Sequence, residues 1–133
     1  MAFKLTGVVG IDLDSEEFSR ELRGETFTIQ LLPLIPTMEV AANDRSSVMA
    51  NSEGSFELQG VRRLQLALFQ EVCASWDLED RKGNAVRVNQ KTVGELALEG
   101  KECAEFIKDA VDRARILFKE RKADRDEESS EGN

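Results

Sequence analysis

The sequence of residues 61–76 is VRRLQLALFQEVCASW, and its apolar residues recur at helical spacing. Apolar side chains follow Val61 at the third, seventh, eleventh and fifteenth positions after it, and the last of them is Trp76. Leu66 and Phe69 widen this stripe, whereas the arginine, glutamine and glutamate residues lie on the opposite side. This pattern predicts an amphipathic helix over the whole stretch, packed on a core through its apolar side.

The same stretch supplies the candidate binding residues. Its apolar side chains point in more than one direction, and one small sheet would leave part of them uncovered. Uncovered apolar area usually marks an interface, and large apolar groups dominate interface energetics. We therefore expect Leu66, Phe69 and Trp76 to contribute to partner binding. The simpler alternative is that they belong to the core, with the indole N–H of Trp76 bonded to water or a carbonyl group.

The chain downstream of Trp76 contains a turn and then returns to helical patterns. Residues 77–84, DLEDRKGN, are typical of a solvated charged turn. The stretch Thr92–Glu95 matches a capping box and predicts the start of a helical region, which Gly100 interrupts. Residues 102–118 carry apolar side chains at helical spacing and predict the second main helix.

The apolar pattern stops at Lys119. From there to the C-terminus the only apolar residue is Ala123, so the segment has almost nothing to bury. Burial cannot then compensate the conformational entropy lost on ordering. We expect residues 1–120 to form a single α+β domain and residues 121–133 to form a disordered acidic tail.

Two stretches near the N-terminus alternate between apolar and polar residues. Residues 3–13 predict a half-buried strand, and residues 25–35 predict a second strand that ends at its prolines. We expect the two strands to pair antiparallel. The predicted fold class is α+β, with a small N-terminal antiparallel sheet packed against two main C-terminal helices, 61–76 and 102–118.

The remaining segments predict only short structures. An acidic capping pattern precedes residues 15–23, which favour a short helix ending at Gly24, with a polar turn as the alternative. Thr37 can cap a helical turn over Met38–Ala42. The small polar residues of 43–60 predict a loop.

Composition argues against catalysis. The chain of 133 residues contains no histidine and no tyrosine, which removes the commonest general base and the commonest metal ligand. Its first glycines, Gly7 and Gly10, do not form a phosphate-binding loop. In the acidic turn, Arg81 occupies a position where a calcium loop needs an oxygen ligand. We expect no enzymatic activity, no cofactor and no metal.

Charge and cysteine content limit which classes of partner and which cellular compartment we expect. The chain has 26 acidic and 18 basic residues, a net charge of −8, which disfavours binding to nucleic acid and to anionic membranes. Neither a signal peptide nor an apolar run of about 20 residues is present, so we expect a cytoplasmic protein. Cys73 and Cys103 fall on apolar sides of predicted helices and favour buried free thiols, with a disulfide or a reactive thiol as the alternative.

These features together resemble a known family. The chain contains the strand Phe27-Thr28-Ile29-Gln30-Leu31-Leu32-Pro33-Leu34, then a helix ending in Val72-Cys73-Ala74-Ser75-Trp76-Asp77, then the turn Lys82-Gly83-Asn84-Ala85-Val86 and a helical C-terminus. This order resembles the tail assembly chaperones of long-tailed bacteriophages and prophages, over residues 3–118. Proline is common in that family just after the turn glycine, whereas this chain has Ala85-Val86 there.

The resemblance implies a function that the residue patterns alone do not. Such chaperones coat the tape measure protein in the host cytoplasm before the tail tube polymerises around it, and they are absent from the finished virion. They are typically made in two lengths by ribosomal frameshifting. The implied partners are the tape measure protein, possibly the tail tube protein, and further copies of the chain. The alternative is a small structural tail or neck protein that is retained in the particle.

Overall fold

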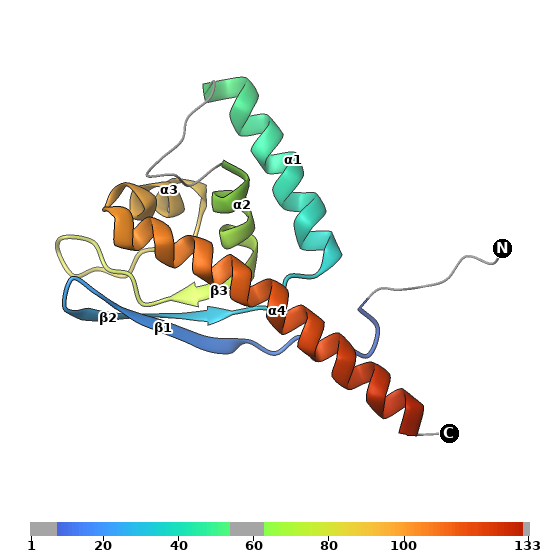
Figure 1. The fold of residues 1–133 in the computed structure, drawn as a ribbon. Helices are drawn as coiled ribbons and strands as arrows, with labels where there is room; N and C mark the ends of the chain where they lie inside the picture. The colour runs from blue at the N-terminus through green and yellow to red at the C-terminus, as the bar shows by residue number, and fades with distance from the viewer. Residues whose placement is uncertain (1–7, 54–62, 132–133) are drawn as a thin grey trace.

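The computed structural model describes residues 8–53 and 63–131, with the main chain only for 48–53 and 128–131 (Figure 1). The elements follow in the order β1, β2, α1, α2, β3, α3, α4. The strands form one antiparallel sheet in the order β1-β2-β3. The fold is therefore α+β with a small sheet, as the sequence predicts.

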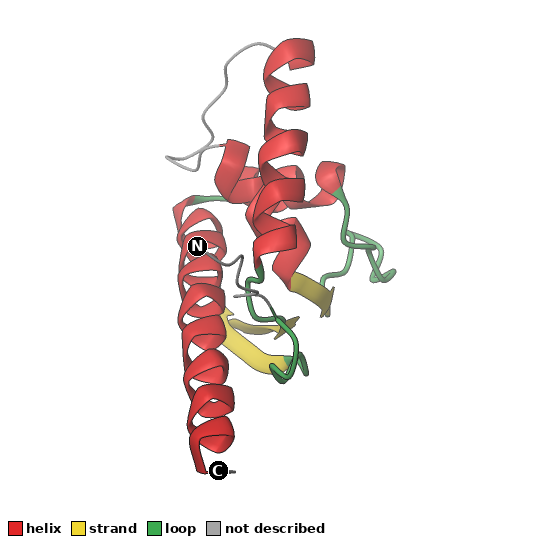
Figure 2. Cartoon of the chain, turned by 90° about the vertical axis from the view of Figure 1, so that its right-hand side faces the viewer, coloured by secondary structure: helices red, strands yellow, loops and turns green. Residues whose placement is uncertain are grey.

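The helices lie on one side of the sheet (Figures 1 and 2). Helix α2 (Arg63–Val72) and helix α4 (Lys101–Glu131) pack against each other and against the strands. Helix α3 (Gln90–Leu98) packs on both of them, and helix α1 (Pro36–Glu53) packs on α2. The opposite face of the sheet is covered by no described helix.

Strands β1 (Glu16–Leu22) and β2 (Glu25–Leu31) form a tight hairpin. The two residues that join them, Arg23 and Gly24, have φ of 53° and 80°, and Leu22 pairs with Glu25. Two consecutive positive φ angles give a type I′ turn, whose twist matches that of the strands. The strand predicted at 25–35 is confirmed for its first seven residues.

The helix predicted over residues 15–23 is wrong, because this segment is β1. Its side chains alternate, with Phe18 and Leu22 toward the helices and Ser19 toward solvent. The positive φ that Gly24 adopts suits a helix end as well as a hairpin turn, so the glycine alone did not separate the two.

The strand predicted over residues 3–13 is also wrong where it can be checked. Residues 8–13 form a turn and an irregular segment, and residues 3–7 lie outside the described chain. The third strand is instead β3 (Cys73–Trp76), which the sequence placed at the end of a helix. It pairs with β2, with Trp76 opposite Ile29. The free edge of β2 offers main-chain hydrogen bonds to β3, and the local spacing of apolar side chains cannot predict where such an edge lies.

The helices also differ from the prediction at their ends. Helix α1 covers residues 43–53, which were predicted as a loop, whereas 54–60 lie outside the described chain. Helix α3 begins three residues earlier than predicted, because Asn89 is its N-cap and exchanges hydrogen bonds with Thr92 at 2.9 and 3.0 Å. The predicted interruption at Gly100 is confirmed, with a φ of 146° between α3 and α4.

Helix α4 continues through most of the segment that was predicted as a disordered tail. It runs to Glu131, well past the last buried apolar residue, Leu117. Arg121 and Arg125 follow Leu117 at intervals of one turn, so they continue its buried stripe with charged groups. Arg121 donates to the carbonyls of residues 12 and 14 at 2.7 and 3.0 Å, and Arg125 donates to that of residue 9 at 3.1 Å.

Candidate protein-binding surface

Phe69 lies in the middle of the core. Its side chain is fully buried, and its ring lies 6.3 Å from Phe106 and 6.2 Å from Trp76 between centroids. The ring of Phe27 lies 5.0 Å from that of Phe106 and completes the cluster. A partner therefore reaches no part of Phe69 while the core is closed, and this member of the predicted binding set has a core position.

Trp76 is partly buried and fully hydrogen-bonded. Its indole N–H donates to the carbonyl of Val86 at 2.6 Å, and its ring packs on Phe27 at 6.1 Å between centroids. The following residue, Asp77, ties the turn to the sheet, because its carboxylate accepts the amide of Thr28 at 3.0 Å. The pair Trp76-Asp77 thus attaches the segment after β3 to strand β2 and to Val86.

The acidic turn after Asp77 is held by Asp80. Its carboxylate accepts the amides of Lys82 at 2.8 Å and Asn84 at 3.0 Å, which holds the pKa of Asp80 below its usual range. Gly83, with a φ of 82°, occupies the left-handed position that the turn requires. The Trp76-Asp77 pair and the glycine turn after it, on which the family resemblance rests, therefore have structural roles in this chain.

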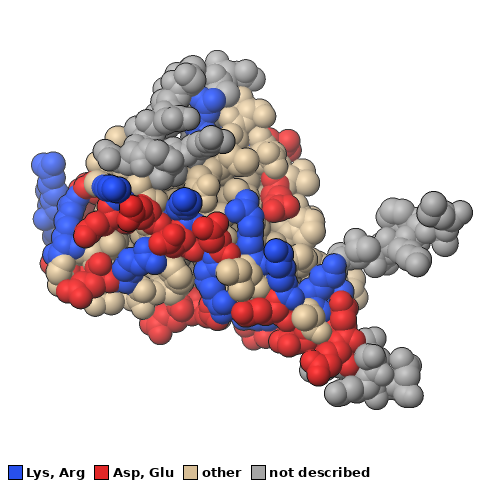
Figure 3. All heavy atoms as spheres, in the orientation of Figure 1, with Lys and Arg blue, Asp and Glu red and all other residues tan. Residues whose placement is uncertain are grey.

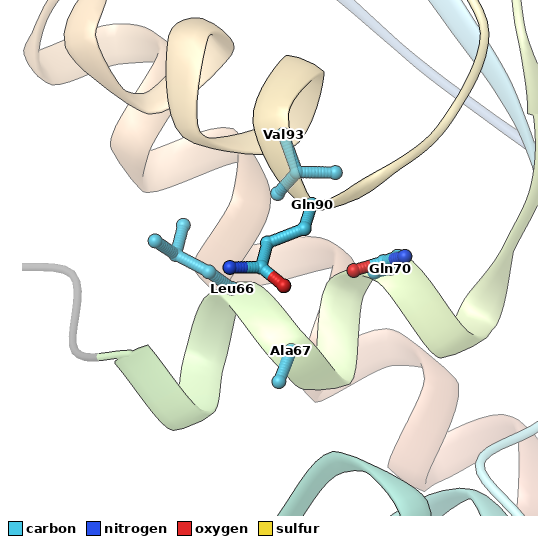
Figure 4. A pocket seen from close by; sticks show the side chains of 5 residues that line it. All are labelled: Leu66, Ala67, Gln70, Gln90 and Val93. Atoms are coloured by element: carbon cyan, nitrogen blue, oxygen red, sulfur yellow. The ribbon is translucent and has the colours of Figure 1, made fainter. Parts of the chain in front are cut away.

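Leu66 lies beside a shallow hollow between α2 and α3 (Figure 4). Buried Leu66, Ala67 and Val93 line it together with the amide side chains of Gln70 and Gln90. Its empty volume of about 170 Å³ includes open solvent. Pockets for small molecules usually enclose about 300–1,000 Å³. The hollow has room for part of one apolar side chain.

The apolar side of α2 is covered more fully than the sequence suggested. Residues 66–69 and Val72 are all buried, because α1, α3, α4 and β3 all pack on α2, and α1 does so where a loop was predicted. Leu64 is the residue of α2 that remains open, at 36% exposed. The surface predicted to bind a partner is therefore mostly internal, and α1 replaces it as the exposed element of this region.

Charge is unevenly distributed over the surface. Figure 3 shows basic and acidic side chains interspersed along α4 and few of either over α1. Arg113 joins α4 to β1 by binding Glu16 at 2.7 and 2.8 Å. This bond holds the pKa of Glu16 below its usual range and raises that of Arg113.

Both cysteines are free and buried. Burial raises the pKa of Cys73 to about 12 and also raises the pKa of Cys103. The thiolate is the nucleophile, so Cys73 should react with Ellman's reagent at pH 8 at least about a hundredfold more slowly in the native protein than in guanidinium, and Cys103 should also react more slowly. Stopped-flow absorbance measures both rates. Rapid reaction of one thiol without denaturant would show that the element carrying it opens, which is β3 for Cys73 and α4 for Cys103.

Among the described residues, no group of three or more Cys, Asp or Glu side chains is arranged to hold a metal ion. No described helix has an apolar stretch long enough to cross a bilayer. Comparison with family models, curated proteins and solved structures finds no match to this chain.

Proposed function

We propose that this chain is a non-enzymatic, protein-binding tail assembly chaperone. Its partner is the tape measure protein, which it holds as a long helix before the tail tube forms. The binding surface is the exposed side of α1. The observation that carries this proposal is that few of the described side chains of α1, at residues 36–47, are buried against the rest of the chain.

Helix α1 contributes little to the core. Among its described side chains, at residues 36–47, Ala42 is buried and Met38 packs partly against the core. One ion pair, Arg45 to Glu71 at 2.7 Å, joins it to α2. Its sequence is rich in Ser and Asn, which have low helix propensity. A helix that is polar nearly all round usually bridges to another body or needs added contacts.

The exposed side of α1 suits a second helix. Val40 is 62% exposed and lies opposite Ala42 on the helix, with Asn43, Asp44 and Ser47 on the same side. Val40, Asn43 and Ser47 are small and uncharged, so a partner helix can approach closely there, whereas Asp44 needs a basic or polar group opposite it or must stay in water at the rim. The partner's own apolar residues would then cover Val40.

The test is to replace Val40 with glutamate. A charge placed in the interface should weaken binding to the tape measure protein at least about tenfold, which corresponds to about 1.4 kcal/mol. Thermal stability should stay within about 0.5 kcal/mol, because the position is exposed. Co-expression, pull-down and light scattering of the complex measure binding.

Leu98→Glu is the matched control, because Leu98 is 58% exposed on α3, a different helix. It should bind as the wild type does. Equal loss in both variants, or none in either, would contradict the role of α1. A chain that stays monomeric and leaves the partner insoluble would contradict the chaperone function. Recovery of the chain in purified particles would favour the retained structural protein instead.

A further inference from the structure

Strand β1 has an open edge. The sheet order is β1-β2-β3, so β1 pairs on one side with β2 and has no neighbouring strand among the described residues. Because Leu22 and Glu25 flank a two-residue turn, they form a hydrogen-bonded pair, and such pairs recur at every second residue. The main-chain groups of the intervening residues, Glu17, Ser19 and Glu21, therefore point to the open edge.

These main-chain groups have no partner in the described chain. No described residue bonds to the N–H or C=O of Glu17, Ser19 or Glu21. Free N–H and C=O groups in a row form a template on which an extended peptide adds as another strand. An added strand would supply the hydrogen bonds that water supplies in the free protein.

The side chains along β1 define what such a strand must carry. Glu17 and Glu21 are exposed on the face of the sheet turned away from the helices, with Ser19 between them. Across the sheet on that face, Gln30 and Thr26 pair with the two glutamates, so no cation on the neighbouring strand neutralises them. A cross-strand Lys or Arg is favourable opposite a glutamate, and a like charge is unfavourable.

The other face of β1 carries Phe18 between Glu16 and Arg20, which are both ion-paired to α4. Phe18 is only partly buried, and its ring lies 5.3 Å from that of Phe106 between centroids. The guanidinium carbon of Arg20 lies 5.9 Å from the centroid of the Phe18 ring, so an apolar side chain on an added strand would cover the part of that ring that Arg20 leaves open. Side chains of one strand point alternately to the two faces, so a matching strand alternates basic and apolar residues.

A second copy of this chain fits the edge poorly. Two β1 strands paired antiparallel about Ser19 would place Glu17 of each copy opposite Glu21 of the other. Both cross-strand pairs on the exposed face would then be like-charged and destabilising. The edge thus repels its own copy and attracts a basic chain.

We propose that the open edge of β1 binds an extended segment of a partner protein as an added strand, and that this segment alternates Lys or Arg with apolar residues. The site lies on the sheet and shares no residue with the α1 surface. Failure of one site in a test therefore leaves the other unaffected.

The experiment uses the full chain labelled with ¹⁵N and a short capped peptide in which Lys alternates with Val. Adding the peptide should shift the amide signals of Glu17, Ser19 and Glu21 and slow their hydrogen exchange. The same peptide with a central Pro lacks a main-chain donor and should bind at least about tenfold more weakly. Equal binding of both peptides would overturn strand addition, and so would slow exchange of these amides without peptide.

Charge reversal tests whether Glu17 and Glu21 select a basic peptide. The double variant Glu17→Lys and Glu21→Lys should bind the Lys peptide at least about tenfold more weakly and should bind a peptide in which Glu replaces Lys. The control double variant Glu79→Lys and Glu95→Lys has the same net charge but alters the turn after β3 and helix α3. It should bind the Lys peptide nearly as the wild type does. Equal weakening in both double variants would reduce the effect to net charge and overturn the proposed site.

Discussion

Replacing Phe106 with alanine is expected to lower the free energy of unfolding by about 3–5 kcal/mol. The Phe106 side chain is fully buried on α4, and its ring contacts those of Phe18, Phe27 and Phe69 at 5.3, 5.0 and 6.3 Å between centroids. It therefore joins α4 to both strands of the hairpin and to α2. Removing it leaves a cavity that these elements cannot all close at once.

Urea denaturation monitored by circular dichroism measures this loss. Ile116→Ala is the control, because Ile116 lies on the same helix and is 48% exposed, so its replacement should cost much less. Domains of this size have a total stability of about 5–15 kcal/mol, so Phe106→Ala removes a large fraction of it. A loss no larger than that of the control would mean that the aromatic cluster is not packed as described.

Phe69 is expected to contribute to stability in the same way as Phe106. Because Phe69 is fully buried beside Phe106, its replacement should lower stability by a similar amount. Loss of binding in a Phe69 variant would then follow from unfolding as well as from a lost contact. Variants of exposed α1 residues such as Val40 separate these effects, which is why the binding test uses them.

Ending the chain after Lys119 should lower the free energy of unfolding by about 2 kcal/mol and the melting temperature by about 5–10 °C. The truncation removes Arg121 and Arg125, whose guanidinium groups bind the carbonyls of residues 9, 12 and 14. A disordered tail would instead give a change within one or two degrees.

A shorter truncation provides the control. Removing residues 128–133 leaves both arginines in place and should change the melting temperature little. Arg121→Met keeps helix propensity and the apolar stem but loses the donors, and should cost about 1 kcal/mol. Differential scanning calorimetry measures all three proteins. If both truncations shift the melting temperature equally little, the C-terminal part of α4 does not hold the N-terminal segment.

The candidate binding residues show what a local sequence pattern can and cannot predict. The sequence singled out Leu66, Phe69 and Trp76 because they are large and apolar, and that property is local. Whether such a side chain faces a partner or the core depends on what packs over it. Helix α1 packs on α2, and its Ser- and Asn-rich sequence gave no signal strong enough to predict a helix beyond the turn over Met38–Ala42.

The sequence by itself determined the fold class, strand β2, the central parts of helices α2 and α4, and the burial of both cysteines. Each of these follows from periodic apolar residues that burial in a core makes favourable whatever the exact partner. The absence of histidine from the sequence likewise removes the commonest general base and the commonest metal ligand, whatever the structure.

Only the tertiary structure decided three further elements. Residues 16–22 form β1 because β2 pairs with them, and residues 73–76 leave the helix because the other edge of β2 offers hydrogen bonds. Helix α4 extends beyond Leu117 because Arg121 and Arg125 find carbonyl groups more than a hundred residues away in the chain. In all three, the stabilising partner is a main-chain group distant in sequence. Main-chain groups are the same in every residue except proline, so no pattern of side chains predicts which distant main-chain groups will form hydrogen bonds.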